Sequence, residues 1–212
     1  MIQMIFNQLH KGTRKNGSRK SDRTDEMHRD IVSDITEQIP DFDEKYIIEY
    51  ESKISCAYGN KFTIDILVRE RNTFPQKIHT VILAKAFISS VQKNRANNAN
   101  TSIGEVIRVL GNNPDVNIFF VTIIPNKIPN YIDGFLKGLH DKDVSYVDLK
   151  KVMNDHPVFK PFKNQIYHGT ITYDVKGVDY NTKETLHNTL KKENIVNIDR
   201  NSFDKSVENI FG

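Results

Sequence analysis

Two apolar runs constrain the fold of this chain more than any other feature. HTVILAKAF at residues 79–87 and NIFFVTII at residues 117–124 are almost without polar residues, and the second run is closed by Pro125. Short runs of this kind, rich in Val, Ile and Phe, are typical of strands that are buried on both faces. The chain is therefore expected to bury a central sheet. Lys85 is the one charged residue inside the first run, and it requires an explanation.

The segments around these runs predict the other elements of the first half. Met27, Ile31, Ile35 and Ile39 recur at four-residue spacing, so a helix is expected from Ser21 or Asp22 to about Ile39, before Pro40. Residues 45–54 and 61–68 have strand character and flank the turn sequence CAYGN, which predicts a hairpin. The polar segment 88–100 precedes a helix expected at 102–110, which ends at Gly111.

The second half has weaker signals. We expect a helix at about 131–139, a short strand at 144–149, a turn around 149–157, a strand at 165–175, a helix at 182–193 and a C-terminal stub. Strands interleaved with helices indicate an α/β (α+β) protein with a central mixed sheet flanked by helices, and residues 117–124 are expected near the centre of the sheet.

Composition limits the class of protein. The 212 residues contain 30 basic and 27 acidic side chains, a net charge of +3, and 38% of the residues are hydrophobic, so one folded domain is expected rather than a disordered chain. The single cysteine excludes an internal disulfide framework and a Cys-rich zinc site. No apolar run reaches the roughly 18 residues that span a membrane. We therefore expect a soluble, cytoplasmic protein without membrane contact.

Basic residues are concentrated near the N-terminus. Residues 1–21 are expected to form a flexible basic arm, and residues 22–212 a single domain. Clustered lysines and arginines favour a phosphate backbone as partner, because they displace its counterions. A second polar segment, residues 92–100, combines basic and amide side chains that can contact DNA bases or phosphates. The residues expected to contact DNA are Lys11, Arg14, Lys15, Arg19, Lys20, Arg23, Lys93, Asn94, Arg95, Asn97 and Asn98.

An aspartate and a lysine mark a candidate catalytic site. Asp65 lies on the second strand of the expected hairpin, and Lys85 lies on the following strand, 20 residues later. This order of helix, hairpin with an acid, strand with a lysine, helix and strand resembles the PD-(D/E)xK nuclease superfamily, in particular type II restriction endonucleases, over residues 22–125. The resemblance implies a restriction-endonuclease-like core that hydrolyses double-stranded DNA with Mg²⁺, as a homodimer. Asp65 would bind the metal, and Lys85 would position or activate water.

The sequence departs from that family at two positions. Ile64 replaces the proline before Asp65, and Leu83 stands where the acidic residue of the Glu-x-Lys motif belongs. Glu105, on the helix after the strand, is our first choice for the missing carboxylate. Together, Asp65, Lys85 and Glu105 form the expected catalytic set.

Two alternatives for the second carboxylate stay open. If the hairpin turn centres on Gly59, Asp65 pairs with Lys53, and Glu51 lies on the same face as Asp65, close enough to share an ion. A shift of one residue in the turn would place Glu51 on the opposite face. Alternatively, Leu83 marks a disabled site in which nothing replaces the acid.

Each of these residues also has a plainer interpretation. Asp65 and Glu51 can be solvated strand residues, Lys85 can extend along the sheet to water, and Glu105 can pair with Arg108 three residues later. The seven histidines form no HxH or HExxH pattern, and neither GxGxxG nor GxxxxGK[ST] occurs. The competing functions are therefore a DNA-binding protein that has lost catalysis, or an interaction protein whose basic arm meets an acidic partner.

Overall fold

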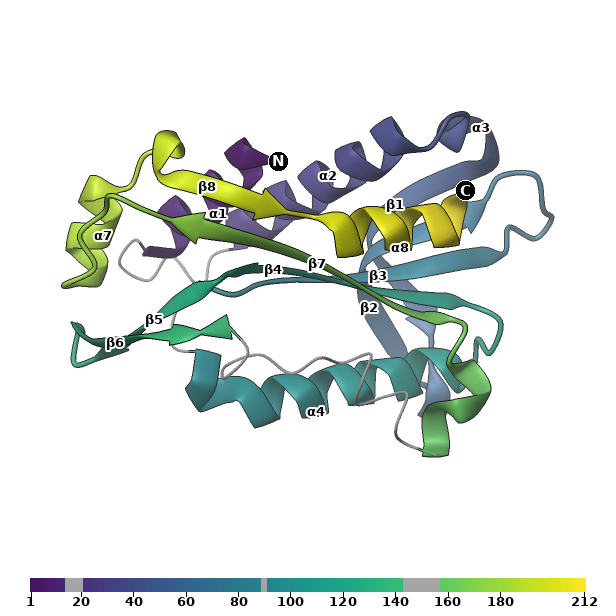
Figure 1. Ribbon diagram of the computed structural model, residues 1–212. Helices are drawn as coiled ribbons and strands as arrows, with labels where there is room; N and C mark the ends of the chain where they lie inside the picture. Colours follow the sequence, from purple (N-terminus) through teal and green to yellow (C-terminus); the bar gives the residue numbers. More distant parts are fainter. Residues whose placement is uncertain (14–20, 89–90, 143–156) are drawn as a thin grey trace.

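The chain folds into three layers, with a mixed sheet between two layers of helices (Figure 1). The computed structural model describes residues 1–13, 21–88, 91–142 and 157–212, and their side chains except those of residues 21–23, 58 and 91–98. The α-helices are α1 (Ile2–Thr13), α2 (Ser21–Gln38), α3 (Phe42–Lys45), α4 (Val91–Leu110), α7 (Lys183–Thr189) and α8 (Asn201–Phe211). Short 3-10 turns are η2 (Ala57–Gly59), η3 (Pro157–Phe162) and η4 (Lys192–Asn194).

Six strands form the main sheet in the order β1-β2-β3-β4-β7-β8. The strands are β1 (Tyr46–Ser55), β2 (Lys61–Glu70), β3 (Ile78–Ala86), β4 (Asn117–Pro125), β7 (Ile166–Val175) and β8 (Ile195–Asp199). The β1/β2, β2/β3 and β7/β8 pairs are antiparallel, whereas β3/β4 and β4/β7 are parallel. A parallel pair needs a crossover connection, and α4 supplies it between β3 and β4.

Each face of the sheet has its own core. Helices α1, α2 and α8 cover one face, and α4 covers the other (Figure 1). The α2 stripe of Met27, Ile31, Ile35 and Ile39 is buried against the first face, as its spacing predicts. The opposite core joins Leu83 of β3 and residues of β4 to the second half of α4. Every residue of β4 except Asn117 is buried, because this strand is covered on both sides.

The expected fold class is confirmed at this level: the protein is α+β, with a mixed sheet flanked by helices. The helix at 21–38, the hairpin, and the strands β3, β4 and β7 lie where the sequence predicts them. The strand expected at 144–149 falls outside the described residues, as does nearly all of the turn expected after it.

Several expectations for local structure are wrong. The helix expected at about 131–139 is instead part of a two-stranded hairpin, β5 (Lys127–Ile132) and β6 (Phe135–Asp141), which projects from the main sheet (Figure 1). Helix α4 begins at Val91 rather than at residue 102, so the amide-rich segment is helical. The helix expected at 182–193 is shorter, and the C-terminal stub is instead strand β8 followed by helix α8.

The N-terminal segment also differs from expectation. Residues 2–13 form helix α1 and not a flexible arm, because Met4, Ile5 and Leu9 are buried in the core shared with α2 and α8. The rest of the expected arm, residues 14–20, lies outside the described residues. Within the described part of the chain, none of the helices combines the length and the apolar character needed to cross a bilayer.

Candidate active site

Asp65 lies where strand β2 separates from strand β3. The pairing of the two strands begins at Ile66 opposite Ile82, so on the Asp65 side of this pair the two backbones no longer share ladder hydrogen bonds. The carboxylate of Asp65 bridges the gap, because its Oδ2 accepts a hydrogen bond of 3.4 Å from the backbone N–H of Ala84. The side chain remains 38% exposed, so its other acceptor positions are open to a ligand.

Lys85 reaches from β3 to helix α4. Its Nζ donates to Ser102 Oγ at 2.9 Å and to Glu105 Oε2 at 3.4 Å. Ser102 and Glu105 are three residues apart on one helix, which places both side chains on the same face. The lysine therefore has polar partners inside its apolar strand, and this offsets the cost of removing an ammonium from water. Glu105 pairs with Lys85 and not with Arg108, against the plainer interpretation of the sequence.

Glu105 connects this lysine to Asp65. Burial raises the pKa of the Glu105 carboxyl above its ordinary value, the neighbouring Lys85 ammonium lowers it, and the negative charge of Asp65 raises it again. The side chain of Glu105 is 18% exposed. The charge of Glu105 is thus influenced by an ammonium from β3 and by a carboxylate from β2, near the point where these two strands diverge.

Leu83, two residues before Lys85, occupies a position that does not suit an acidic side chain. Leu83 is 3% exposed and belongs to the core beneath α4, together with Val106 and Val109. A carboxylate at position 83 would lie in that apolar core at a high desolvation cost. Glu105 enters the site from the helix above the same core, at a position that retains some contact with solvent.

The hairpin register differs from the one we expected. Lys53 is opposite Thr63 and not Asp65, while Tyr50 is opposite Ile66 and Ser52 is opposite Ile64. Glu51 is therefore the residue across from Asp65, but its φ of 50° departs from strand geometry. Glu51 is exposed, and no hydrogen bond or ion pair joins it to Asp65.

Two residues of the site were missed in the sequence. His28 of α2 is 4% exposed, and its Nε2 lies 3.9 Å from Asp65 Oδ2 and has no hydrogen-bond partner among the described residues. Ser102 is 1% exposed and holds Lys85. In the sequence, His28 could have been noticed because it directly follows Met27, a residue of the apolar stripe of its helix, and is therefore expected near the buried face. The signal for Ser102 was its three-residue spacing from Glu105.

A buried polar pair lies beside Lys85 in the sheet. Thr122 of β4 is directly opposite Lys85 in the parallel register. Its Oγ1 is 3.0 Å from Nε2 of His168 on β7, and burial lowers the pKa of His168 to about 4. The imidazole is therefore neutral at physiological pH, and it extends the polar zone across three strands without adding charge.

The residues expected to contact DNA fall mostly outside what the structure describes. Lys11 is paired with Glu26, which holds α1 against α2. Arg14, Lys15, Arg19 and Lys20 lie in the segment that is not described, and the side chain of Arg23 is not described. Residues 93–98 belong to helix α4, so Lys93, Asn94, Arg95, Asn97 and Asn98 are helical, but their side chains are likewise not described.

The donor set at this site fits Mg²⁺. In the described part of the chain, no three His, Cys, Asp or Glu side chains are grouped so as to hold a metal ion. Mg²⁺, however, commonly takes only one or two protein carboxylates and completes its shell with water and substrate phosphate. Asp65 and Glu105 would supply two carboxylates. Burial and the negative charge of Asp65 both raise the pKa of Glu105 and so disfavour its charged form. A nearby divalent cation would stabilise that charged form.

Comparison with known proteins adds no relative: no protein-family model, no curated protein and no solved structure matches this chain.

Proposed function

We propose that the protein is a Mg²⁺-dependent endonuclease that hydrolyses phosphodiester bonds in double-stranded DNA, in the manner of type II restriction enzymes. The observation that carries the proposal is the Lys85–Glu105 ion pair, in which Lys85 directly follows Ala84, the residue whose N–H binds the Asp65 carboxylate. Lys85 lies in an apolar strand and is held by a serine and a glutamate of the next helix. Removing such charged groups from water costs free energy, so stability alone does not account for this arrangement. The order α2, β1, β2, β3, α4, β4 around these residues further supports a nuclease-like core.

The roles of the three residues follow from their chemistry. Asp65 and Glu105 would hold Mg²⁺, which supplies Lewis-acid polarisation of the phosphate and a more acidic water. Lys85 would donate a hydrogen bond to the attacking water or to a phosphate oxygen and so fix its orientation. Ser102 keeps the ammonium in place by accepting one of its protons. In the hydrolysis, the water oxygen bonds to phosphorus, one ester P–O bond breaks, and the leaving oxygen takes up a proton.

Duplex DNA is the proposed substrate for two reasons. The chain carries a net charge of +3 with basic clusters near the N-terminus and around residue 95, which suits a phosphate backbone. Cutting both strands of a symmetric site also calls for two active sites related by a twofold axis, so a homodimer is part of the proposal.

A second candidate function is DNA binding without catalysis. This function is favoured by Leu83, which stands where the family has a metal-binding acid. The remaining acid, Glu105, already forms an ion pair with Lys85, so its carboxylate would serve the lysine instead of a metal ion. Such a protein would retain the fold and bind duplex DNA, but it would not hydrolyse it.

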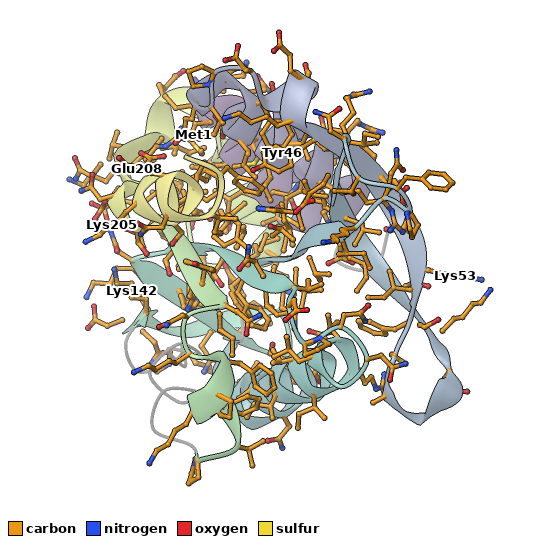
Figure 2. The ribbon with its side chains drawn as sticks, turned by 90° about the vertical axis from the view of Figure 1, so that its right-hand side faces the viewer. Met1, Tyr46, Lys53, Lys142, Lys205 and Glu208 are labelled. Carbon is orange, nitrogen blue, oxygen red and sulfur yellow. The ribbon has the colours of Figure 1, made fainter. Side chains whose placement is uncertain are left out.

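Plasmid cleavage separates the two functions. Supercoiled plasmids of varied sequence, incubated with the protein and Mg²⁺, are expected to give discrete linear fragments, and EDTA is expected to stop the reaction. Asp65→Asn is expected to abolish cleavage and Glu105→Gln to lower its rate by about 10²-fold or more, and both variants are expected to keep duplex binding in Ca²⁺. Glu208→Gln is the matched control, because Glu208 lies on α8 (Figure 2), on the sheet face opposite α4.

The possible outcomes are distinct. Retardation of DNA without cutting would replace the nuclease proposal with the binding protein. Full cleavage by Asp65→Asn would remove Asp65 from the reaction. Neither binding nor cleavage by the wild-type protein would exclude both functions and leave a protein-interaction role.

A further inference from the structure

A cationic groove lies between the tip of the β1/β2 hairpin and the second half of α4. Its volume is about 540 Å³, and its lining residues are Cys56, Ala57, Asn60, Lys61, Phe62 and Arg108. We propose that this groove binds a backbone phosphate of duplex DNA beside the scissile phosphate. The inference rests on the proposed function, since it names a substrate contact of the same enzyme outside its catalytic residues.

Arg108 is held in a position suited to a phosphate. Its guanidinium carbon lies 5.7 Å from the centroid of the Phe62 ring, in a cation–π contact. A cation–π contact uses none of the N–H groups as a hydrogen-bond donor to an oxygen, so the guanidinium can still donate to two phosphate oxygens. In the part of the chain that the structure describes, no carboxylate forms an ion pair with Arg108.

Lys61 adds a second cation to the groove. It is the exposed first residue of β2, and it too has no carboxylate partner among the described side chains. Neither cation forms an ion pair with a described carboxylate, and no acidic residue is part of the lining, so the groove favours an anion. A lysine beside an arginine is a common arrangement for phosphate.

The walls of the groove are fastened together. Asn112 Nδ2 donates to the carbonyl of Cys56 at 2.8 Å, and Asn113 Nδ2 donates to the carbonyl of Ser55 at 3.0 Å. Gly111 allows the close approach, because a Cβ there would lie 2.6 Å from Cβ of Ala57. The groove is therefore formed before any ligand arrives, and a preformed site loses little entropy on binding.

The position of the groove points to a polymer rather than to an isolated anion. Arg108 follows Glu105 by three residues, which is ~4.5 Å along the helix axis. Arg108 also lies near enough to Glu105 to act on the charge of its carboxylate. A strand whose scissile phosphate lies at Lys85 and Glu105 would therefore pass Arg108 and Lys61, where a neighbouring phosphate can bind.

The test is equilibrium binding of a fluorescein-labelled duplex of ~30 base pairs to the full chain, by anisotropy in EDTA, at several salt concentrations. The Lys61→Ala/Arg108→Ala double variant is compared with Lys183→Ala/Lys205→Ala, which removes the same charge. Lys183 also lies over an aromatic ring, that of Tyr131. Lys205 lies on the opposite side of the view from Lys53 of the hairpin (Figure 2).

The groove variant is expected to bind about 10-fold more weakly than the control at moderate salt. The magnitude of its slope of log K against log[salt] is expected to be smaller by about 1–2, since each phosphate contact contributes ~0.9 to that slope. Equal affinity and slope for the two double variants would overturn the inference. A wild-type protein that binds with the expected difference but never cleaves would overturn the proposed nuclease and not the groove. A wild-type protein that fails to bind duplex DNA would overturn both.

Discussion

Lys85 Nζ lies 3.4 Å from Glu105 Oε2, although the two residues belong to a buried strand and to the helix that covers it. This contact depends on the β3-α4-β4 crossover, which lays α4 over the end of β3. It turns a lysine that would be costly in an apolar strand into part of a polar site. The same contact sets the first expectation for mutants.

Lys85→Met, which removes the group that orients water, and Glu105→Gln, which removes a proposed Mg²⁺ ligand, are each expected to lower the rate of plasmid cleavage by about 10²-fold or more, the usual scale for a single catalytic group. Residues that act as a unit are not additive, so the double variant should be no slower than either single variant. Single-turnover cleavage of supercoiled plasmid measures this, with Lys205→Met as the control. Multiplied losses in the double variant would show that the two residues act separately.

His28 gives a second expectation. A buried nitrogen without a hydrogen-bond partner costs about 1–3 kcal/mol, and Nε2 of His28 is such an atom. His28→Leu is therefore expected to raise the free energy of unfolding by about 1 kcal/mol and to lower cleavage, because Asp65 loses its polar neighbour. This is the exchange of stability for activity that active sites commonly show.

Urea unfolding and plasmid cleavage measured on the same samples test this expectation. His79→Leu is the control, because Nδ1 of His79 lies 2.8 Å from Thr80 Oγ1 and its removal should destabilise the fold. Destabilisation of the protein by His28→Leu, to the same extent as by His79→Leu, would refute the trade-off.

The sequence predicted those elements whose signal is local. The stripe of α2 and the apolar run of β4 mark their own burial, because each residue's environment follows from the period of its own segment. The hairpin β5/β6 also had a local signal that we overlooked. Asp133 and Gly134 have φ values of 52° and 85°, and an Asp-Gly pair between apolar segments is the pattern of a tight hairpin turn.

The remaining features depend on tertiary contacts. Helix α1 was missed because its buried stripe includes Gln8, Gly12 and Thr13, which are buried only through the contacts that α1 makes with other elements. Within the candidate site, the order of elements pointed to Asp65, Lys85 and Glu105, but the distance of His28 from Asp65 depends on how α2 crosses the sheet. No spacing within the sequence encodes that distance.

The buried His168 predicts a dependence of stability on pH. Burial lowers its pKa in the folded protein from 6.5 to about 4, so between these values the unfolded chain binds a proton that the folded chain does not. The stabilising contribution is complete above about pH 6.5 and is lost as the pH falls towards 4. A lowering of this size corresponds to about 3 kcal/mol.

His168→Gln is expected to flatten the fall in the free energy of unfolding between pH 6.5 and 4, since glutamine can still bond to Thr122 but does not titrate. Urea unfolding at several pH values measures the difference from wild type. His140→Gln, on the projecting hairpin, serves as the control. An unchanged pH dependence in His168→Gln would mean that the imidazole is not protonated on unfolding in this range.

Gly111 provides a test of how the hairpin tip is attached to α4. A Cβ at this position would lie 2.6 Å from Ala57 Cβ and 3.0 Å from the carbonyl oxygen of Ile107. Gly111→Ala is therefore expected to lower the free energy of unfolding by about 1–3 kcal/mol, as overpacking does. For Gly104, in the middle of the same helix, no described atom outside the neighbouring helix backbone lies within 4 Å of an added Cβ. Gly104→Ala should stabilise by about 0.5–1 kcal/mol, because alanine loses less backbone entropy in a helix. Thermal and urea unfolding of the two variants tests the pair, and a neutral or stabilising Gly111→Ala would show that the tip can move away from α4 without cost.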